Sequence, residues 1–400
     1  MRKPSGQGLG GILLALLFLA AVFPPLMGFF TDLHAHVSLT EKRELAPFPG
    51  IPASPGALRA FPGAFEKYFG DRFGLRQPMI SLHNWIEITF FKPDSSTRVV
   101  KGRDGWYYLH QSIGYCTRQK PLDQAQLAQW AETLAARRDF LAARGVTYLF
   151  VVAPSKPGIY PEHLPPDVRP AEENALDQLS AYIAGLPGRV PPPRAPFPPP
   201  PPPDIPFLDL RPELRQAARQ AQVYETTDTH WNDRGALVAA LRIADALRER
   251  GVFLPPPPPF RETVQERNGG DLAQMLGLQY VLRGTAPLVE PVIPGAVKRI
   301  VPDYMSRAWS YYPPTVWEKR GLPGHLVMIG DSFTMSTACS SFLAEFFGRS
   351  VAVHRDLLPP DAEGLERIVQ AEHPDVVVEE IVERNLVQPV SATQGLLARR

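Results

Sequence analysis

The sequence predicts an α/β protein with a mostly parallel β-sheet flanked by helices. Short, mostly apolar runs of strand length recur along the chain, for example at residues 146–153, 326–329 and 376–382. Segments with helical spacing of apolar residues lie between several of them, such as 235–250 and 362–371. Alternating strands and helices are typical of a parallel sheet covered on both faces. In such sheets, functional sites form at the carboxyl ends of the strands.

The main predicted domain, residues 99–400, begins with a hairpin. Residues 99–109 contain an Asp104-Gly105 turn between apolar stretches, which is a strong hairpin signal. A helix is then expected at 122–144 and a buried parallel strand at 146–153. Further strands are expected at 205–210, 223–226, 326–329, 351–354 and 376–382, and further helices at 171–184, 235–250, 334–347 and 362–371.

Composition narrows the class of protein. The chain has 400 residues and a formal net charge of +1, so nucleic acid is not an expected partner. Its two cysteines, Cys116 and Cys339, form one disulfide or none, and without a C-x-x-C pair they do not indicate a metal site. Proline-rich insertions at 187–206 and 255–259 are expected to be polyproline loops, either as spacers or as ligands for aromatic grooves.

Residues 1–31 are predicted to be a cytoplasmic stub and a transmembrane signal anchor. Arg2 and Lys3 precede a run from residue 8 to 30 that carries no charge and is long enough to span a bilayer. Cleavage near Ala20 is the alternative, which leaves the fate of the anchor open. We therefore expect a single-pass protein of the cell inner membrane, with residues 32–400 on the periplasmic, extracytoplasmic side.

Residues 32–98 are predicted to be an N-terminal extracytoplasmic helical segment that packs on the main domain. Aromatic and aliphatic residues between Phe61 and Phe91 follow helical spacing, which favours a pair of helices. A membrane-surface role for these aromatic residues is the alternative interpretation.

Ser332 is the first candidate catalytic residue. The run 325–329 predicts a buried strand, Gly330 allows a tight exit, and a helix is expected from Thr334. A serine at such a junction lies near free backbone N–H groups that can stabilise an oxyanion. The alternative is that Asp331 and Ser332 only cap the helix that follows.

Asp228 and His230 form the second candidate motif. In an extended stretch, residues two positions apart point the same way, so the Asp228 carboxylate would reach a ring nitrogen of His230. The alternative is a capping aspartate beside a surface histidine. No metal site is expected, because His325 and His354 lack ligand spacing. Together with Ser332, the motif supplies the carboxylate, imidazole and hydroxyl that acyl transfer through a serine requires.

Two cations are further candidates for substrate binding. Lys156 follows the end of a predicted strand, where it either faces the cleft or is solvated. Arg384 either binds a carboxylated sugar or forms a surface ion pair with Glu380 or Glu383.

The chain also resembles the alginate O-acetyltransferase family, the AlgJ/AlgX-like proteins with an SGNH-hydrolase-like fold. The resemblance covers residues 40–388, with landmarks at 41–49, 69–73, 102–108, 153–162, 228–231, 270–272, 330–333 and 383–384. In this family the Asp-x-His pair precedes the serine, as it does here. The resemblance implies that Ser332 is the nucleophile, His230 the general base and Asp228 the carboxylate that orients it.

The same resemblance implies an O-acetyltransferase that carries acetyl on the serine to hydroxyls of a secreted, alginate-like polysaccharide. It further implies a multi-spanning membrane-bound O-acyltransferase as acetyl donor and no cofactor. The proline insertions depart from the family landmarks, and the short stretch after Leu386 favours the AlgJ-like form without a carbohydrate-binding module. Two alternatives remain: an SGNH-type acetylesterase, and a non-catalytic scaffold in a polysaccharide modification or export complex.

Overall fold

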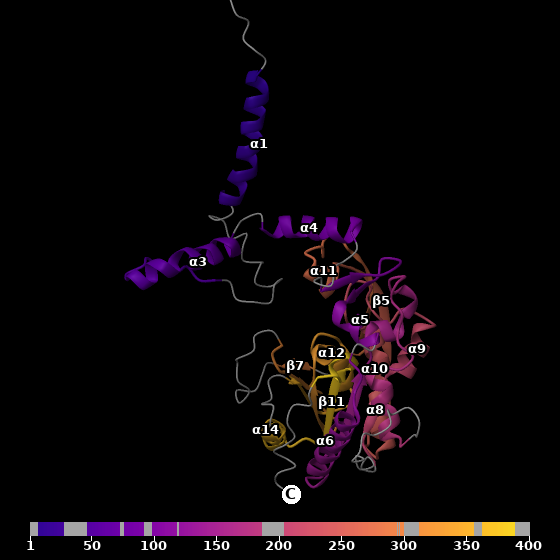
Figure 1. The fold of residues 1–400 in the computed structure, drawn as a ribbon. Helices are drawn as coiled ribbons and strands as arrows, with labels where there is room; N and C mark the ends of the chain where they lie inside the picture. Colours follow the sequence, from indigo (N-terminus) through magenta and orange to yellow (C-terminus); the bar gives the residue numbers. More distant parts are fainter. Residues whose placement is uncertain are drawn as a thin grey trace, which may run out of the picture. The chain divides into compact units, whose positions relative to one another are not determined.

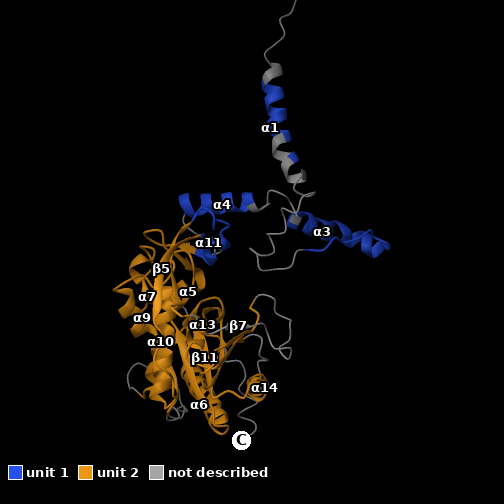
Figure 2. Cartoon of the chain, turned by 180° about the vertical axis from the view of Figure 1, so that it is seen from behind, with its two compact units in different colours: residues 1–99, 268–282 blue, residues 100–267, 283–400 orange. Residues whose placement is uncertain are grey.

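The computed structural model divides the chain into two compact units (Figure 2). Unit 1 comprises residues 1–99 and 268–282, and unit 2 comprises residues 100–267 and 283–400. The structure describes residues 7–27, 46–72, 76–91, 98–117, 120–185, 204–293, 295, 297–299, 312–355 and 362–388.

Unit 1 is helical. Its helices are α1 (Gln7–Met27), α3 (Pro55–Arg72), α4 (Arg76–Phe90) and α11 (Asp271–Met275), so the helix pair expected between Phe61 and Phe91 is present as α3 and α4. Ser81 and Asn84 of α4 donate hydrogen bonds of 2.8 and 3.0 Å to the carbonyls of Gly277 and Leu276, which brings residues 268–282 into this unit. Among the described residues, no helix has the combined length and apolar character that crossing a membrane requires. Residues 28–45, which include much of the first family landmark, lie outside the described residues.

Unit 2 is built on a seven-stranded sheet, of which Figure 1 labels β7 and β11. The order of its strands is β4-β3-β11-β9-β10-β8-β7. The strands are β3 (Thr147–Ala153), β4 (Phe207–Asp209), β7 (Val297–Arg299), β8 (Thr315–Glu318), β9 (His325–Gly330), β10 (Arg349–His354) and β11 (Val376–Val382). The five strands from β4 to β10 run parallel, whereas β8 and β7 are antiparallel to their neighbours. The predicted mostly parallel sheet is thereby confirmed.

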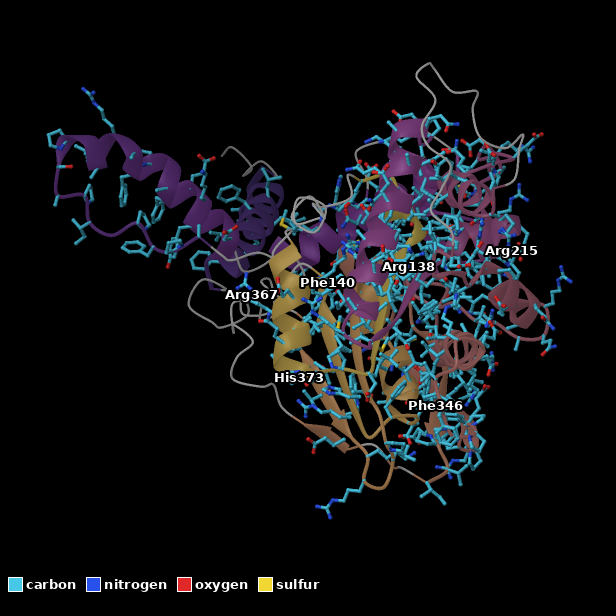
Figure 3. The ribbon with its side chains drawn as sticks, turned by 90° about the horizontal axis from the view of Figure 1, so that it is seen from below. Arg138, Phe140, Arg215, Phe346, Arg367 and His373 are labelled. Atoms are coloured by element: carbon cyan, nitrogen blue, oxygen red, sulfur yellow. The ribbon has the colours of Figure 1, made fainter. Side chains whose placement is uncertain are left out.

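Helices cover both faces of this sheet. The helices of unit 2 are α5 (His110–Cys116), α6 (Gln124–Ala142), α7 (Lys156–Ile159), α8 (Ala175–Ile183), α9 (Arg211–Ala218), α10 (Asp233–Glu249), α12 (Ser332–Met335), α13 (Cys339–Ala344) and α14 (Ala362–Glu372), with short 3-10 turns η3 (Pro161–His163) and η5 (Glu383–Asn385). Successive strand residues point to opposite faces. Leu149 and Val151 therefore join the apolar cluster under α10 and α13, while Phe150 joins the cluster under α6, α8 and α14. Phe346 packs in the first cluster and Phe140 against the second (Figure 3).

Two small hairpins complete the described strands. One joins β1 (Val99–Lys101) to β2 (Tyr107–Leu109), as predicted, and its turn residues Asp104 and Gly105 both have positive φ. The other pairs β5 (Phe260–Arg267) with β6 (Gly284–Pro291) and was not predicted, because β5 is polar and mostly exposed. Residues 255–259 form the connection from α10 to β5, whereas residues 186–203, most of the longer proline-rich insertion, lie outside the described residues.

Two predicted elements were wrong. Residues 223–226 are not a strand, since only Tyr224 forms a bridge, with Trp231. The helix expected at 334–347 is two short helices, α12 and α13. The hydroxyl of Thr337 donates to the Phe333 carbonyl, four residues back, in the gap between them, an interaction that competes with regular helix.

The two cysteines are free and buried, so they form no disulfide. Burial raises the pKa of the Cys116 thiol to about 12 and also raises the pKa of Cys339. Both thiols are therefore neutral at physiological pH.

Candidate active site

Ser332 lies directly after the carboxyl end of β9, as the first residue of α12. The Asp331 carboxylate fixes this turn by accepting hydrogen bonds from the backbone N–H groups of Phe333 (2.9 Å) and Val382 (2.8 Å). Gly330 is required for a steric reason, because a Cβ there would lie 2.1 Å from Thr334 Oγ1. Asp331 therefore caps the helix, as the alternative interpretation expected. The Ser332 hydroxyl takes no part in this cap.

Glu380, on the neighbouring strand β11, also stabilises this turn. Its Oε2 accepts hydrogen bonds from Thr334 Oγ1 (2.9 Å) and the Asp331 backbone N–H (3.2 Å), and the residue is 3% exposed. Burial, together with the negative charge of Asp331, raises the pKa of the Glu380 carboxyl. Sequence analysis missed this role, although an acid inside an apolar strand is unusual enough to serve as a signal.

His230 connects the other two candidate residues. Its Nδ1 lies 2.7 Å from Asp228 Oδ1, and its Nε2 lies 2.8 Å from Ser332 Oγ. Asp228 Oδ1 also accepts a hydrogen bond from the His230 backbone N–H at 2.9 Å, which makes the segment a tight turn instead of the expected extended stretch. His230 is 9% exposed, so its ring is largely shielded from water. The structure therefore brings the three predicted residues into one hydrogen-bonded line.

The turn that carries His230 is closed by its flanking residues. Tyr224 and Trp231 form its bridge, and the Asn232 N–H donates to the Val223 carbonyl at 3.0 Å. The Asn232 side chain accepts from the Gly235 N–H at 3.0 Å and so caps α10. Because the turn ends in this cap, α10 anchors it to the core.

Aromatic side chains join the His230 turn to the Ser332 helix. The Trp231 indole N–H donates to Thr337 Oγ1 at 2.9 Å, and its ring meets the Phe333 ring edge-on at 4.9 Å. The His230 ring lies 4.8 Å from the same Phe333 ring. These contacts fix the position of the His230 imidazole relative to the Ser332 hydroxyl.

Lys156 is placed differently from the expectation of a cation that faces substrate. It is 2% exposed, and its Nζ donates to the carbonyls of Glu225 (2.9 Å), Thr226 (3.1 Å) and Asp228 (2.5 Å). Its ammonium therefore holds the turn that carries Asp228 and His230. Glu225 is half-buried here, and desolvation plus the charge of Asp228 raises the pKa of its carboxyl to about 7.

Arg384 follows β11 in η5 and is 8% exposed. Its guanidinium lies 5.6 Å from the centre of the Phe333 ring. The alternative ion pair with Glu380 or Glu383 is absent, since neither carboxylate of these described residues lies within 4.0 Å of the guanidinium nitrogens. Arg384 therefore lies beside the candidate site and forms no ion pair within the part of the chain that the structure describes.

The fold defines the chain as an SGNH-hydrolase-like α/β protein. The family model described as "SGNH hydrolase-like domain, acetyltransferase AlgX" matches residues 99–188 and 203–383, and the chain belongs to this family. The resemblance read from the sequence landmarks is confirmed.

Parts of the chain are also similar to individual proteins. The "Probable alginate O-acetylase AlgJ" of Pseudomonas aeruginosa is 28% identical over 236 residues, covering 58% of this chain and 52% of the relative. The protein of the same name from Pseudomonas putida is 29% identical over 231 residues, covering 56% and 53%. The chain thus spans about half the length of the curated relatives it matches. Among solved structures, it is similar to the "O-Acetyltransferase Domain of Pseudomonas putida AlgJ", with 20% identity, a TM-score of 0.48 and coverage of 75% of this chain and 97% of the other.

Proposed function

We propose that this protein is an O-acetyltransferase that moves an acetyl group, by way of an acyl-serine, to hydroxyls of a secreted, alginate-like polysaccharide. The observation that carries the proposal is the line of hydrogen bonds from Asp228 through His230 to Ser332, at 2.7 and 2.8 Å. Membership of an acetyltransferase family and relatives named alginate O-acetylase support acetyl as the transferred group.

In the first step, Ser332 Oγ attacks the carbonyl carbon of the acetyl donor while His230 Nε2 takes the hydroxyl proton. Asp228 holds the Nδ1 proton and stabilises the imidazolium that forms. The negative charge on the carbonyl oxygen is stabilised by the Ser332 backbone N–H. The bond to the leaving group then breaks, and that group departs with the proton from His230, which leaves acetyl-Ser332.

In the second step, a sugar hydroxyl takes the place of the leaving group. His230 Nε2 removes its proton, the sugar oxygen attacks the acetyl carbon, and the Ser332 oxygen leaves with that proton. The enzyme returns to its starting state, and the sugar carries the acetyl ester. If water attacks instead, the same residues give acetate, which is the esterase alternative.

The partners and location form the finer part of the proposal. A multi-spanning membrane-bound O-acyltransferase would deliver acetyl across the inner membrane, and the uncharged run at residues 8–30 would anchor this chain there with its sheet domain in the periplasm. Protease protection of the full chain in sealed inner-membrane vesicles tests the location. Removal by a high-salt wash, or equal digestion from both sides, would contradict it.

The catalytic proposal is tested by incubating the full chain in detergent with a small acetyl ester, then mapping peptides by mass. We expect an added acetyl group on Ser332 that is absent in Ser332→Ala and strongly reduced in His230→Ala. Adding oligosaccharides separates the outcomes, since acetylated sugar indicates a transferase and free acetate alone an esterase. A folded protein with neither adduct nor ester turnover would support the scaffold alternative.

A further inference from the structure

Helix α4 turns an apolar side toward solvent. Six large apolar side chains, each 36–68% exposed, lie on this helix or directly after it: Met79, Leu82, Trp85, Ile86, Phe90 and Phe91. We call these six residues the outer face of α4. At about 100° per residue, the five that belong to the helix fall on one side of it. The other exposed positions between residues 78 and 90 are Pro78, His83 and Thr89, none of which is Asp, Glu, Lys or Arg.

The opposite side of α4, which contacts the rest of unit 1, is more polar. Its half-buried or buried positions are Ile80, Ser81, Asn84, Glu87 and Ile88. Ser81 donates a hydrogen bond of 2.8 Å to the Gly277 carbonyl. Asn84 donates one of 3.0 Å to the Leu276 carbonyl, directly after α11 (Figure 2). A surface helix normally buries its apolar side and exposes its polar side. Because α4 has the reverse arrangement, its outer face is expected to be covered by a partner.

The shape of the outer face argues against pairing with another helix. Trp85 and Phe90 lie about 140° apart around the helix axis, at about 3.6 residues per turn, so the face is wider than a coiled-coil seam. Their rings meet edge-on at 5.8 Å, so the two edges of the face are in contact. The helix has 15 residues, whereas a coiled coil requires apolar positions sustained over at least about three heptads. A short, broad apolar face fits a continuous lipid surface better than a second helix.

The charges around α4 favour anionic lipid. In the sequence, Arg76 and Lys92 flank the apolar positions, and Glu87 is the one acid between them. Glu87 belongs to the half-buried side, so no carboxylate among residues 78–90 is on the exposed side. An apolar face with aromatic residues, flanked by cations, is typical of a helix that lies in the plane of a membrane surface. Trp85, at the edge of the face, suits the headgroup level, where indole rings are enriched.

We propose that α4 lies on the surface of an anionic lipid bilayer, with its outer face buried about 5–10 Å into the boundary between headgroups and acyl chains. The aromatic residues of α4 thus have the membrane-surface role that the sequence left open as an alternative. The inference goes beyond the proposed transferase function. It also differs from the proposed anchor at residues 8–30, because it assigns a second membrane contact to another part of the chain.

The test places a fluorescent label on the exposed side of α4 in the full chain. Thr89→Cys supplies an exposed thiol there, while the two native thiols are buried and react slowly with the label. The labelled chain is reconstituted into vesicles of phosphatidylcholine and phosphatidylglycerol, with and without bromine on the acyl chains. We expect brominated lipid to quench this label and to leave the same label at Arg261→Cys unquenched, because the Arg261 side chain is 69% exposed on β5, outside α4. Equal quenching at the two positions would overturn the inference.

Variants then test the outer face itself. Leu82→Gln combined with Ile86→Gln removes two exposed apolar side chains, so the protein should keep its circular dichroism while the label at residue 89 loses its quenching. Phe253→Gln is the matched control, because Phe253 is 83% exposed and lies outside α4, and it should leave the quenching unchanged. Quenching that the Leu82 and Ile86 double variant retains would refute the outer face as the lipid contact.

The preference for anionic lipid is tested separately. Arg76→Gln combined with Lys92→Gln should weaken the quenching in vesicles that contain phosphatidylglycerol, because it removes the two flanking cations. It should leave the quenching in vesicles of phosphatidylcholine alone unchanged. Undiminished quenching in the anionic vesicles would refute the charge argument.

A protein partner would give a different result. If a second copy covers the outer face, Thr89→Cys chains form a disulfide-linked dimer in detergent, and brominated lipid does not quench the label in vesicles. That result would overturn the lipid assignment. The acetyl adduct on Ser332 is measured in detergent without vesicles, so the proposed catalysis and the membrane contact succeed or fail independently.

Discussion

Lys156→Met tests whether a buried ammonium holds the turn that carries Asp228 and His230. Methionine keeps most of the apolar stem beside Trp106 and Tyr108, whose ring centres lie 5.5 and 5.3 Å from the ammonium. It removes all three hydrogen bonds to the carbonyls of residues 225, 226 and 228. The Thr226 carbonyl keeps the Tyr107 backbone N–H as a donor at 2.9 Å, and each buried carbonyl that loses its donor costs about 1–3 kcal/mol. The ammonium no longer has to be desolvated, which offsets part of this loss, so we expect the free energy of unfolding to fall by about 3 kcal/mol.

Ester turnover should fall as well, because one of the released carbonyls belongs to Asp228. A displacement of about 1 Å in a catalytic group can cost about 100-fold in rate, so we expect kcat to fall about 10- to 100-fold. KM for a small ester should change less, since Lys156 is too buried to touch it.

The assays are urea denaturation followed by tryptophan fluorescence, and hydrolysis of a small acetyl ester. Lys101→Met, at an exposed lysine of β1, is the control and should match the wild type in both. A Lys156→Met protein with wild-type stability and wild-type kcat would refute the argument that this ammonium holds the turn.

Three further changes have expected outcomes. Asp228→Asn should lower ester kcat by up to about 10⁴-fold while the protein stays folded by circular dichroism, because the imidazole loses the carboxylate that orients it; a loss below 10-fold would contradict that role. Gly330→Ala should destabilise the protein by about 2–3 kcal/mol, because the new Cβ meets Thr334 and Glu380, whereas Gly284→Ala, with no atom within 4 Å, should not; equal urea midpoints for the two would contradict the steric argument. Burial raises the pKa of Glu383 to about 7, so the folded state favours the neutral acid, and its contribution to stability is complete below about pH 4.5 and is lost as pH rises through 7. Glu383→Gln should therefore reduce the drop in unfolding free energy between pH 5 and pH 8, and an unchanged drop would show that Glu383 titrates normally.

The elements that sequence reasoning found are those with a local signal. The β3, β9 and β11 strands are almost wholly buried, so each is a mostly apolar run, interrupted in β11 by Glu379 and Glu380, that is visible without any neighbour. Residues 223 and 224 are also completely buried. Their apolar side chains led to the prediction of a strand where the structure has a turn. What distinguishes them is long-range: Tyr224 bridges Trp231, and its hydroxyl donates to the carbonyl of Pro154. The polar β5 carries no apolar alternation and depends on β6 for its pairing.

The residues of the candidate site also fall into two groups: those with a local sequence signal and those whose role depends on partners distant in the chain. Asp228, His230 and Ser332 were identified because their residue types and local context point to one chemistry, and the structure places them in contact. The partners of Lys156 were not predictable, because they are backbone carbonyls about 70 positions away in the chain. Glu380 was predictable in principle, since an acid among buried valines requires a partner.

The free, buried cysteines can report how often the folded chain opens locally. Its folding requires no oxidation of thiols, so strong reductant should leave stability and activity unchanged. A neutral thiol reacts slowly with alkylating reagents, since the thiolate is the reactive form. Labelling of Cys339, in the helix that follows the Ser332 turn, must therefore wait for that segment to open. The rate of its labelling measures how often the segment that carries Ser332 leaves its native position, in unmodified protein and without a substrate.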